Sequence, residues 1–266
     1  MTMRQIEIDA TGDRPLMADL HQPEGKGPWP LVVGVSGGGW VKGHRRVLNP
    51  WGAWLAKKGI AFASIDYRRA ETEAVFPGNV KDVVQALSFF AESGSDFDLE
   101  ARNMIVLGVS AGAHLSSLAL LSNAFETPNV AGFIGVYGVY DLMVHWQADL
   151  WRNAAPGADK TVAMLGATPF DDPQLYHSAS PLRQITYDKA FPTLLIWGQL
   201  DREVLPEYQS AAFSRALQQA HFPVRNVELP DAGHLWFSED GPEVPGSHSS
   251  RVAPDIFRFI KRQIGQ

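Results

Sequence analysis

Five short, continuous apolar segments constrain the fold of this chain more than any other feature of its sequence. They occupy residues 31–35, 60–65, 104–109, 132–136 and 193–197. A run of this length without polar alternation is typical of a strand that is buried on both faces. Helix-length stretches lie between several of these runs, at 49–58, 80–92 and 111–122. Strands that alternate with helices predict a mainly parallel sheet with helices on both of its faces.

Shorter segments extend this sheet toward both ends of the chain. Residues 5–9 and 16–21 have strand-like patterns separated by turn-forming residues at 11–15, which predicts an antiparallel pair at one edge. After residue 205 we expect a helix at 206–220, a strand at 224–229, a surface loop at 241–250 and an amphipathic helix at 253–264. The pattern therefore predicts about eight strands in an α/β fold.

The alternation of strands and helices fails between Tyr137 and Pro192. Connections inside compact domains are usually short, and a much longer one is commonly functional. This stretch is rich in aromatic residues, which include Trp146, Trp151, Phe170 and Tyr176. We therefore expect a single domain over residues 1–266 with a cap or lid inserted at about 138–192.

Composition and charge exclude several classes of protein. Hydrophobic residues make up 45% of the chain and charged residues 20%, as is typical of a globular protein and not of a disordered one. The net charge of −6 has the wrong sign for a nucleic-acid partner or an anionic membrane surface. Cysteine is absent, which excludes disulfide scaffolds, thiol nucleophiles and cysteine-held metals.

Targeting and membrane-spanning segments are not recognisable in the sequence. The first nine residues already carry charges, so they contain no apolar core of a signal peptide. No apolar run approaches the length of about 18 residues that a membrane-spanning helix needs. We expect a soluble, cytoplasmic protein without a membrane span. The sequence leaves open whether it is a monomer or a homo-oligomer.

The pentapeptide Gly108-Val109-Ser110-Ala111-Gly112 has the pattern GxSxG and lies between a predicted strand and a predicted helix. In that setting the two glycines relieve crowding around a strained turn that presents the Ser110 hydroxyl outside the sheet. The helix N-terminus favours negative charge that develops beside it. A turn built from small residues is the alternative interpretation. The position between strand and helix favours a nucleophile.

A serine hydroxyl becomes a good nucleophile only when a base takes its proton and a third group orients that base. His234 follows the predicted strand 224–229, at the sheet edge where parallel sheets bind ligands. The other histidines lack this setting, and His114 is expected to pack. Asp201 follows the strand at 193–197, with Glu203 as a nearby alternative. The order serine, aspartate, histidine is that of the α/β-hydrolases.

A glycine-rich loop, Ser36-Gly37-Gly38-Gly39-Trp40, follows the first buried strand. Acyl transfer needs N–H donors directed at the developing oxyanion, and a loop without side chains lets its amides approach the substrate. Ala111, directly after the candidate nucleophile, supplies another amide. A phosphate-binding loop is the competing interpretation, and it is excluded because neither a GK[ST] ending nor a GxGxxG pattern is present.

Together these motifs resemble those of α/β-hydrolase fold carboxylesterases of the hormone-sensitive-lipase-like and small acyl-esterase type. The resemblance extends from about Leu31 to the C-terminus. It rests on Ser36-Gly37-Gly38-Gly39-Trp40 against the family's HGGGW loop, Asp66-Tyr67-Arg68, Phe76-Pro77-Gly78, the GxSxG pentapeptide, Ala179-Ser180-Pro181, the Asp201 loop and Gly233-His234. It implies an oxyanion hole formed by the amides of Gly38, Gly39 and Ala111, and a structural role for Asp66-Tyr67-Arg68.

Ser36 departs from the family pattern, because the family usually has a histidine there that holds the loop through side-chain hydrogen bonds. A serine hydroxyl retains the capacity for one such bond. Since the backbone amides of the loop do not depend on this side chain, we expect activity to persist.

The motifs predict a serine hydrolase that cleaves small or aryl carboxylic esters through an acyl-enzyme, without a metal or cofactor. Trp40, Trp236 and the aromatic residues of the insertion indicate an apolar pocket for a small-molecule ester, or else residues of the core. Three alternatives remain: an arylformamidase, a peptidase of the prolyl-oligopeptidase type, which the absence of a propeller-length segment disfavours, and a catalytically silent fold that binds a small molecule.

Overall fold

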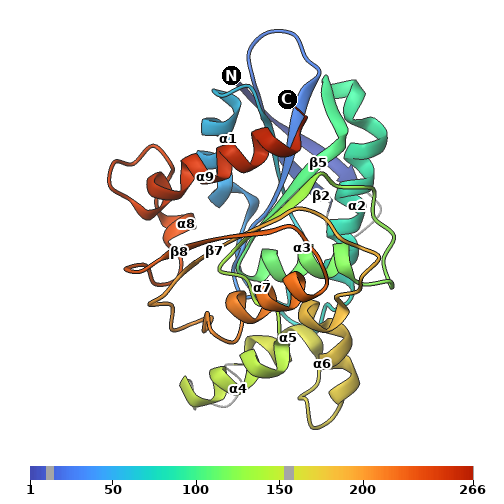
Figure 1. The fold of residues 1–266 in the computed structure, drawn as a ribbon. Coiled ribbons are helices and arrows are strands. Elements are labelled where there is room, and N and C mark those ends of the chain that lie inside the picture. Colours follow the sequence, from blue (N-terminus) through green and yellow to red (C-terminus); the bar gives the residue numbers. More distant parts are fainter. Residues whose placement is uncertain (10–14, 153–158, 266) are drawn as a thin grey trace.

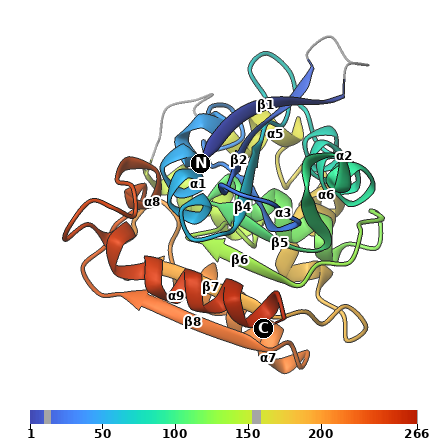
Figure 2. The same ribbon diagram turned by 90° about the horizontal axis from the view of Figure 1, so that it is seen from above.

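The computed structural model describes residues 1–9, 15–152 and 159–265. Within these residues, eight strands form one sheet in the order β1-β2-β4-β3-β5-β6-β7-β8. The strands are β1 (Thr2–Asp9), β2 (Leu16–Gln22), β3 (Trp29–Val35), β4 (Ala61–Ile65), β5 (Leu99–Val109), β6 (Gly132–Val136), β7 (Thr193–Gly198) and β8 (Val224–Leu229). β2 is antiparallel to both of its neighbours, and all other neighbouring strands are parallel. Seen from above, β1 and β8 lie at opposite edges of the sheet (Figure 2).

Helices cover both faces of this sheet, as predicted. α1 (Asn49–Ala56) and α9 (His248–Gln263) lie on one side of it, and α3 (Ala111–Leu121) and α7 (Ser210–Gln219) lie on the other (Figure 1). α2 (Gly78–Ser93) packs beside α3, and the short α8 (Trp236–Glu239) packs beside α9. The predicted fold class, a mainly parallel α/β sheet, is confirmed. None of the helices in the described part of the chain is both long and apolar enough to cross a membrane.

The C-terminal helix differs from the prediction. It was expected to begin at Ala253 after a loop at 241–250, but α9 begins at His248, inside that loop. The Ser247 side chain accepts a hydrogen bond from the Ser250 amide and thereby caps the helix, and Pro254 lies inside it. Composition rich in Ser and Pro therefore concealed a helix start. Of the predicted turn at 11–15, residues 11–14 lie outside the described residues.

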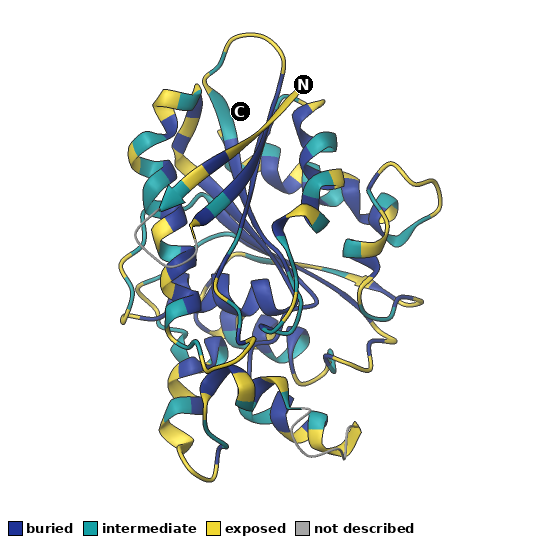
Figure 3. Cartoon of the chain, turned by 180° about the vertical axis from the view of Figure 1, so that it is seen from behind, coloured by how far each residue is buried: buried dark blue, intermediate teal, exposed yellow. Residues whose placement is uncertain are grey.

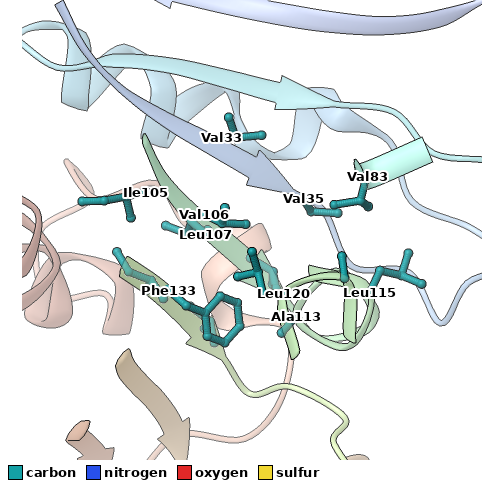
Figure 4. Close-up of a cluster of buried hydrophobic side chains, with 14 of the residues drawn as sticks. Val33, Val35, Val83, Ile105, Val106, Leu107, Ala113, Leu115, Leu120 and Phe133 are labelled. Atoms are coloured by element: carbon teal, nitrogen blue, oxygen red, sulfur yellow. The ribbon is translucent and has the colours of Figure 1, made fainter. Parts of the chain in front are cut away.

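Part of the core lies where β3, β5 and β6 meet α2 and α3. All residues of β4, β6 and α3 are buried, which explains why the corresponding runs show no polar alternation. Figure 4 shows Val33 and Val35 of β3, Leu107 of β5 and Phe133 of β6 packed with Leu115 of α3 in one apolar cluster. Close packing on both faces fixes the positions of the strand ends, from which the functional loops extend.

Residues 137–192 connect β6 to β7 and contain α4 (Leu142–Arg152), α5 (Lys160–Leu165), α6 (Pro173–Ala179) and the short 3₁₀ helix η3 (Pro181–Gln184). α4, α5 and α6 lie together at one end of the molecule (Figure 1), and exposed residues line their outer surfaces (Figure 3). Hydrogen bonds attach them to the rest of the protein: the amides of Val75 and Phe76 donate to Met164 O at 3.1 and 3.2 Å. The Gln209 side chain accepts from the amides of Tyr140 and Asp141.

Candidate active site

Ser110 occupies a sharp turn between β5 and α3. Its φ and ψ are 52° and −118°, an unfavourable conformation for a residue with a side chain, and its amide donates to Val136 O at 2.9 Å. A Cβ atom at Gly108 would lie under 3.0 Å from the backbone of α3, and one at Gly112 would lie equally close to the backbone of β3. The strand and the helix approach each other so closely that only glycine fits at these two positions.

The three side chains singled out in the sequence come together at the carboxyl edge of the sheet. Ser110 Oγ lies 3.1 Å from His234 Nε2, and His234 Nδ1 lies 2.6 Å from Asp201 Oδ2. The other carboxylate oxygen of Asp201 accepts hydrogen bonds from the amides of Glu203 and Val204, both at 2.9 Å. The side chains of His234 and Asp201 are 6% and 1% exposed, so surrounding protein shields their contact from water. This is the arrangement that activates a serine hydroxyl.

The alternative acid Glu203 and two aspartates of the segment between β6 and β7 occupy other positions. The Glu203 side chain is exposed, and the residue reaches Asp201 only through its amide. Asp171 binds Thr168, and Asp172 caps α6. Among these acids, Asp201 is the one in contact with the imidazole of His234.

His114 packs, as expected, although it lies one helical turn after Ser110. Its Nδ1 accepts a hydrogen bond from Trp40 Nε1 at 3.0 Å, so its Nε2 carries the proton and donates to Ala179 O at 2.8 Å. Burial lowers the pKa of His114 to about 4. The imidazole is therefore neutral near pH 7 and joins α3 to the segment that precedes η3.

The glycine loop passes directly beside the serine. A Cβ atom at Gly37 would lie 3.1 Å from the Cβ of Ser110. Gly38 and Gly39 follow with φ angles of +128° and +58°, in the region that favours glycine. Ala111 is the first residue of α3, so its amide has no acceptor four residues earlier in the helix. The glycine loop and the start of α3 therefore both lie next to Ser110, and their residues have side chains that are absent or small.

Hydrogen bonds to the backbone hold this loop in place despite the serine at position 36. The Tyr67 hydroxyl donates to Ser36 O at 3.1 Å, and the Lys42 amide donates to Gly38 O at 2.9 Å. The residues that flank Tyr67 form ion pairs: Asp66 with Arg45, and Arg68 with Asp82. The segment Asp66-Tyr67-Arg68 therefore holds the loop through the hydrogen bond from Tyr67 to the backbone of Ser36. This bond does not depend on which side chain stands at position 36.

Tyr137 is a contact of the imidazole that the sequence reasoning missed. Its ring centroid lies 4.4 Å from that of His234, and it also packs edge-on against Trp236. The residue is buried and has a φ of 35°, which is unusual for a bulky side chain. Burial raises the pKa of its hydroxyl. Tyr137 directly follows β6, and this position at a strand end is the same signal that identified Asp201 and His234.

The aromatic residues expected to line a pocket divide into two groups. Trp40 is 1% exposed and bonded to His114, and Trp236 is 4% exposed, so both rings are packed against protein. Trp151 and Phe170 are each 86% exposed. For Trp40 and Trp236 the burial therefore favours the second of the two interpretations, residues of the core, over the lining of a pocket.

The sequence model of the BD-FAE family matches residues 18–217. The chain belongs to the BD-FAE family. The matched region includes Ser110 and Asp201 and ends before His234. Esterase LipQ of Mycobacterium tuberculosis is 30% identical to this BD-FAE member over 218 residues, which are 78% of this chain and 50% of the relative. Esterase LipC of the same organism is 31% identical over 236 residues, which are 84% of this chain and 57% of the relative. The chain spans about half the length of these curated relatives.

Solved structures share the fold of this BD-FAE member. Carboxyl esterase 2 of Tuber melanosporum superposes with a TM-score of 0.79 at 23% identity, over 98% of this chain and 86% of that one. A propionate-bound esterase of Thermogutta terrifontis gives a TM-score of 0.78 at 18% identity, over 99% of this chain and 94% of that one. At such identities the likeness shows the fold, and the predicted α/β-hydrolase fold is confirmed. The predicted resemblance to carboxylesterases of this fold is confirmed as well.

Proposed function

We propose that this protein is a carboxylic ester hydrolase that forms an acyl-enzyme on Ser110. The observation that carries the proposal is the continuous chain of contacts from Ser110 Oγ to His234 at 3.1 Å and from His234 to Asp201 at 2.6 Å. The esterases among its relatives and structural neighbours support the same reaction class.

In this proposal His234 is the general base. The Nδ1–H of its neutral imidazole donates to Asp201, so that Nε2 carries the lone pair that takes the proton of the Ser110 hydroxyl. The carboxylate of Asp201 then stabilises the imidazolium cation. His234 next gives the proton to the departing alcohol, and a water molecule releases the acyl group from Ser110 by the same proton transfers.

The amides of Gly38, Gly39 and Ala111 are the proposed donors to the oxyanion of the tetrahedral intermediate. Support comes from the glycine loop that passes beside Ser110 and from the Ala111 amide, which has no acceptor four residues earlier in α3. Each such donor contributes about 2.7–4 kcal/mol to lowering the barrier. Because backbone amides act here, the serine at position 36 is compatible with full activity.

The proposed substrate is a small or aryl ester, and residues 138–192 are proposed to form a cap on a single domain. The grouping of α4, α5 and α6 at one end of the molecule supports the cap (Figure 1). Structures of the Thermogutta terrifontis esterase with bound propionate and with bound butyrate support short acyl groups. The relatives and neighbours named above are esterases, so they lend no support to an arylformamidase.

The test is hydrolysis of p-nitrophenyl acetate and butyrate by the wild type and by Ser110→Ala. We expect kcat to fall by a factor on the order of 10⁶ in the variant, because the nucleophile is gone. A fluorophosphonate probe is expected to label the wild type and not the variant. Ser117→Ala is a matched control on the same helix, because the Ser117 hydroxyl donates to Ala113 O within α3. It is expected to keep the wild-type rate and the label.

Three other results would count against the proposal. Unchanged ester hydrolysis in Ser110→Ala would contradict the role of Ser110. Absence of both turnover and labelling in the wild type would favour a silent binding protein. A kcat/KM for an N-formyl aromatic amine above that for the esters would favour an amide-directed hydrolase.

A further inference from the structure

A lysine of the inserted segment lies over the glycine loop. Lys160 is the first residue of α5, and its Cδ and Nζ atoms lie 2.6 and 3.5 Å from the point that a Cβ atom of Gly39 would occupy. Gly39 belongs to the loop beside Ser110, so the ammonium group lies against the loop proposed to bind the oxyanion. The absence of a side chain at position 39 makes room for the aliphatic part of the lysine.

The acidic groups of the same segment are engaged elsewhere. Asp149 forms an ion pair with Arg152 and lies 3.5 Å from His145 Nε2. Asp159 accepts hydrogen bonds from two amides in the first turn of α5, at 2.9 and 3.0 Å. Across the described residues, Lys160 has no carboxylate within the 4.0 Å of an ion pair. Lys160 acts on Asp149 through its charge without forming an ion pair with it, so its ammonium group can still bind another anion.

Lys160, His234 and Asp201 all influence the pKa of the same residue, His145. Burial, together with the positive charges of Arg152 and Lys160, lowers the pKa of His145 to about 3. His234 and Asp201 also act on His145. The charge of Lys160 therefore lies in the same part of the molecule as His234 and Asp201. His145 itself is neutral near pH 7, so it adds no positive charge to that neighbourhood.

We propose that Lys160 binds an anionic group of the substrate, and that the preferred substrates are esters that carry a carboxylate. The proposal rests on the ester hydrolase function proposed above and names the substrate class for the same site. A neutral ester offers the ammonium group only uncharged acceptors, whereas a carboxylate that reaches it forms a stronger, charge-assisted hydrogen bond. The cation is supplied by the insertion, so the insertion selects the substrate while the sheet edge supplies the chemistry.

The test compares charged with neutral esters in two matched pairs. The first pair is mono-p-nitrophenyl glutarate, which carries a carboxylate on its acyl side, and the neutral p-nitrophenyl pentanoate. The second pair is 4-acetoxybenzoate, which carries a carboxylate on its alcohol side, and its methyl ester. We expect one pair to show a higher kcat/KM for the charged ester. In that pair, Lys160→Met is expected to lower the ratio of charged to neutral kcat/KM at least tenfold, mainly through KM. Lys160→Glu is expected to lower it further, and Lys160→Arg to retain most of it.

Lys26→Met is the matched control, because Lys26 is an exposed lysine that precedes β3, at the opposite end of the parallel strands. It is expected to leave both ratios unchanged. Equal ratios in the wild type and in Lys160→Met for both pairs would overturn the proposal. A loss of turnover that is the same for charged and neutral esters would also overturn it, because it would assign Lys160 to the oxyanion or to folding. If no ester shows turnover that depends on Ser110, the function proposed above fails, and the comparison of the wild type with Ser110→Ala reveals this outcome separately from the ratios.

Discussion

The carboxyl edge of the sheet and the inserted segment 138–192 are built in different ways. At the edge, Ser110 and Asp201 are buried, and the His234 side chain, which contacts both, is 6% exposed. In the insertion, by contrast, Trp151 and Phe170 are each 86% exposed. Groups that transfer protons need fixed geometry, and a packed sheet provides it. A segment with the proposed role of a cap needs surface instead, and exposed side chains change with little effect on stability.

Replacing Asp201 with asparagine tests how strictly the edge is organised. Oδ1 of Asp201 accepts from two amides, so the oxygen of an asparagine would stay on them and its NH₂ group would point at His234 Nδ1. The imidazole would then hold its proton on Nε2, where it cannot accept the serine proton. We expect kcat for p-nitrophenyl acetate to fall by about 10⁴ with the fold intact. A fall of less than tenfold would show that the edge tolerates the wrong tautomer.

Paired truncations of apolar side chains measure how differently the two regions contribute to stability. Leu107 is fully buried in the central cluster (Figure 4), whereas Phe170 is largely exposed. We expect Leu107→Ala to lower the free energy of unfolding by about 2–5 kcal/mol, because it leaves a cavity. Phe170→Ala is expected to change it by about 0.5 kcal/mol or less. Urea unfolding monitored by tryptophan fluorescence gives both values. Similar decreases in the free energy of unfolding of both variants would contradict the difference in stability proposed for the two regions.

His114 joins the two regions through its hydrogen bonds to Trp40 and Ala179, and acid should lower stability because protonation of Nδ1 removes the acceptor of the Trp40 indole. The folded pKa of about 4 lies below the ordinary value of 6.5, so the unfolded chain takes up a proton first as the pH falls. Stability is therefore complete above about pH 6.5 and is lost as the pH falls toward 4, by on the order of 3 kcal/mol for this group.

His114→Gln removes this titration, and the free energy of unfolding should then depend less steeply on pH between 7 and 4.5. Unfolding in urea at several pH values measures the slope. His145, whose pKa is lowered to about 3, keeps contributing in the variant. An unchanged slope in His114→Gln would show that His114 is protonated in the folded protein at these pH values.

Local patterns carried enough information to predict most of the sheet and the three residues of the candidate site. The apolar runs at 104–109 and 193–197 lie within β5 and β7, because strands buried on both faces contain no polar positions. Ser110, Asp201 and His234 each follow a strand. Since parallel strands end at the same edge, their chain positions alone place them together.

Contacts between distant segments escaped prediction. Nothing in the residues near Trp40 reveals that its indole donates to His114, and nothing near Lys160 reveals that it lies over Gly39. The strand-end position of Tyr137 was available in the sequence, but its contact with the imidazole was not.

The sequence by itself determined the order of strands and helices, the glycines that the tight turn at Ser110 requires, and the three residues that meet at the sheet edge. These follow from short-range sterics and from the periodicity of burial, which act between residues close in the chain. Only the tertiary structure decided which aromatic rings fill the core and which cation of the insertion reaches the glycine loop. Such contacts depend on how whole elements pack, and packing is a property of the assembled fold.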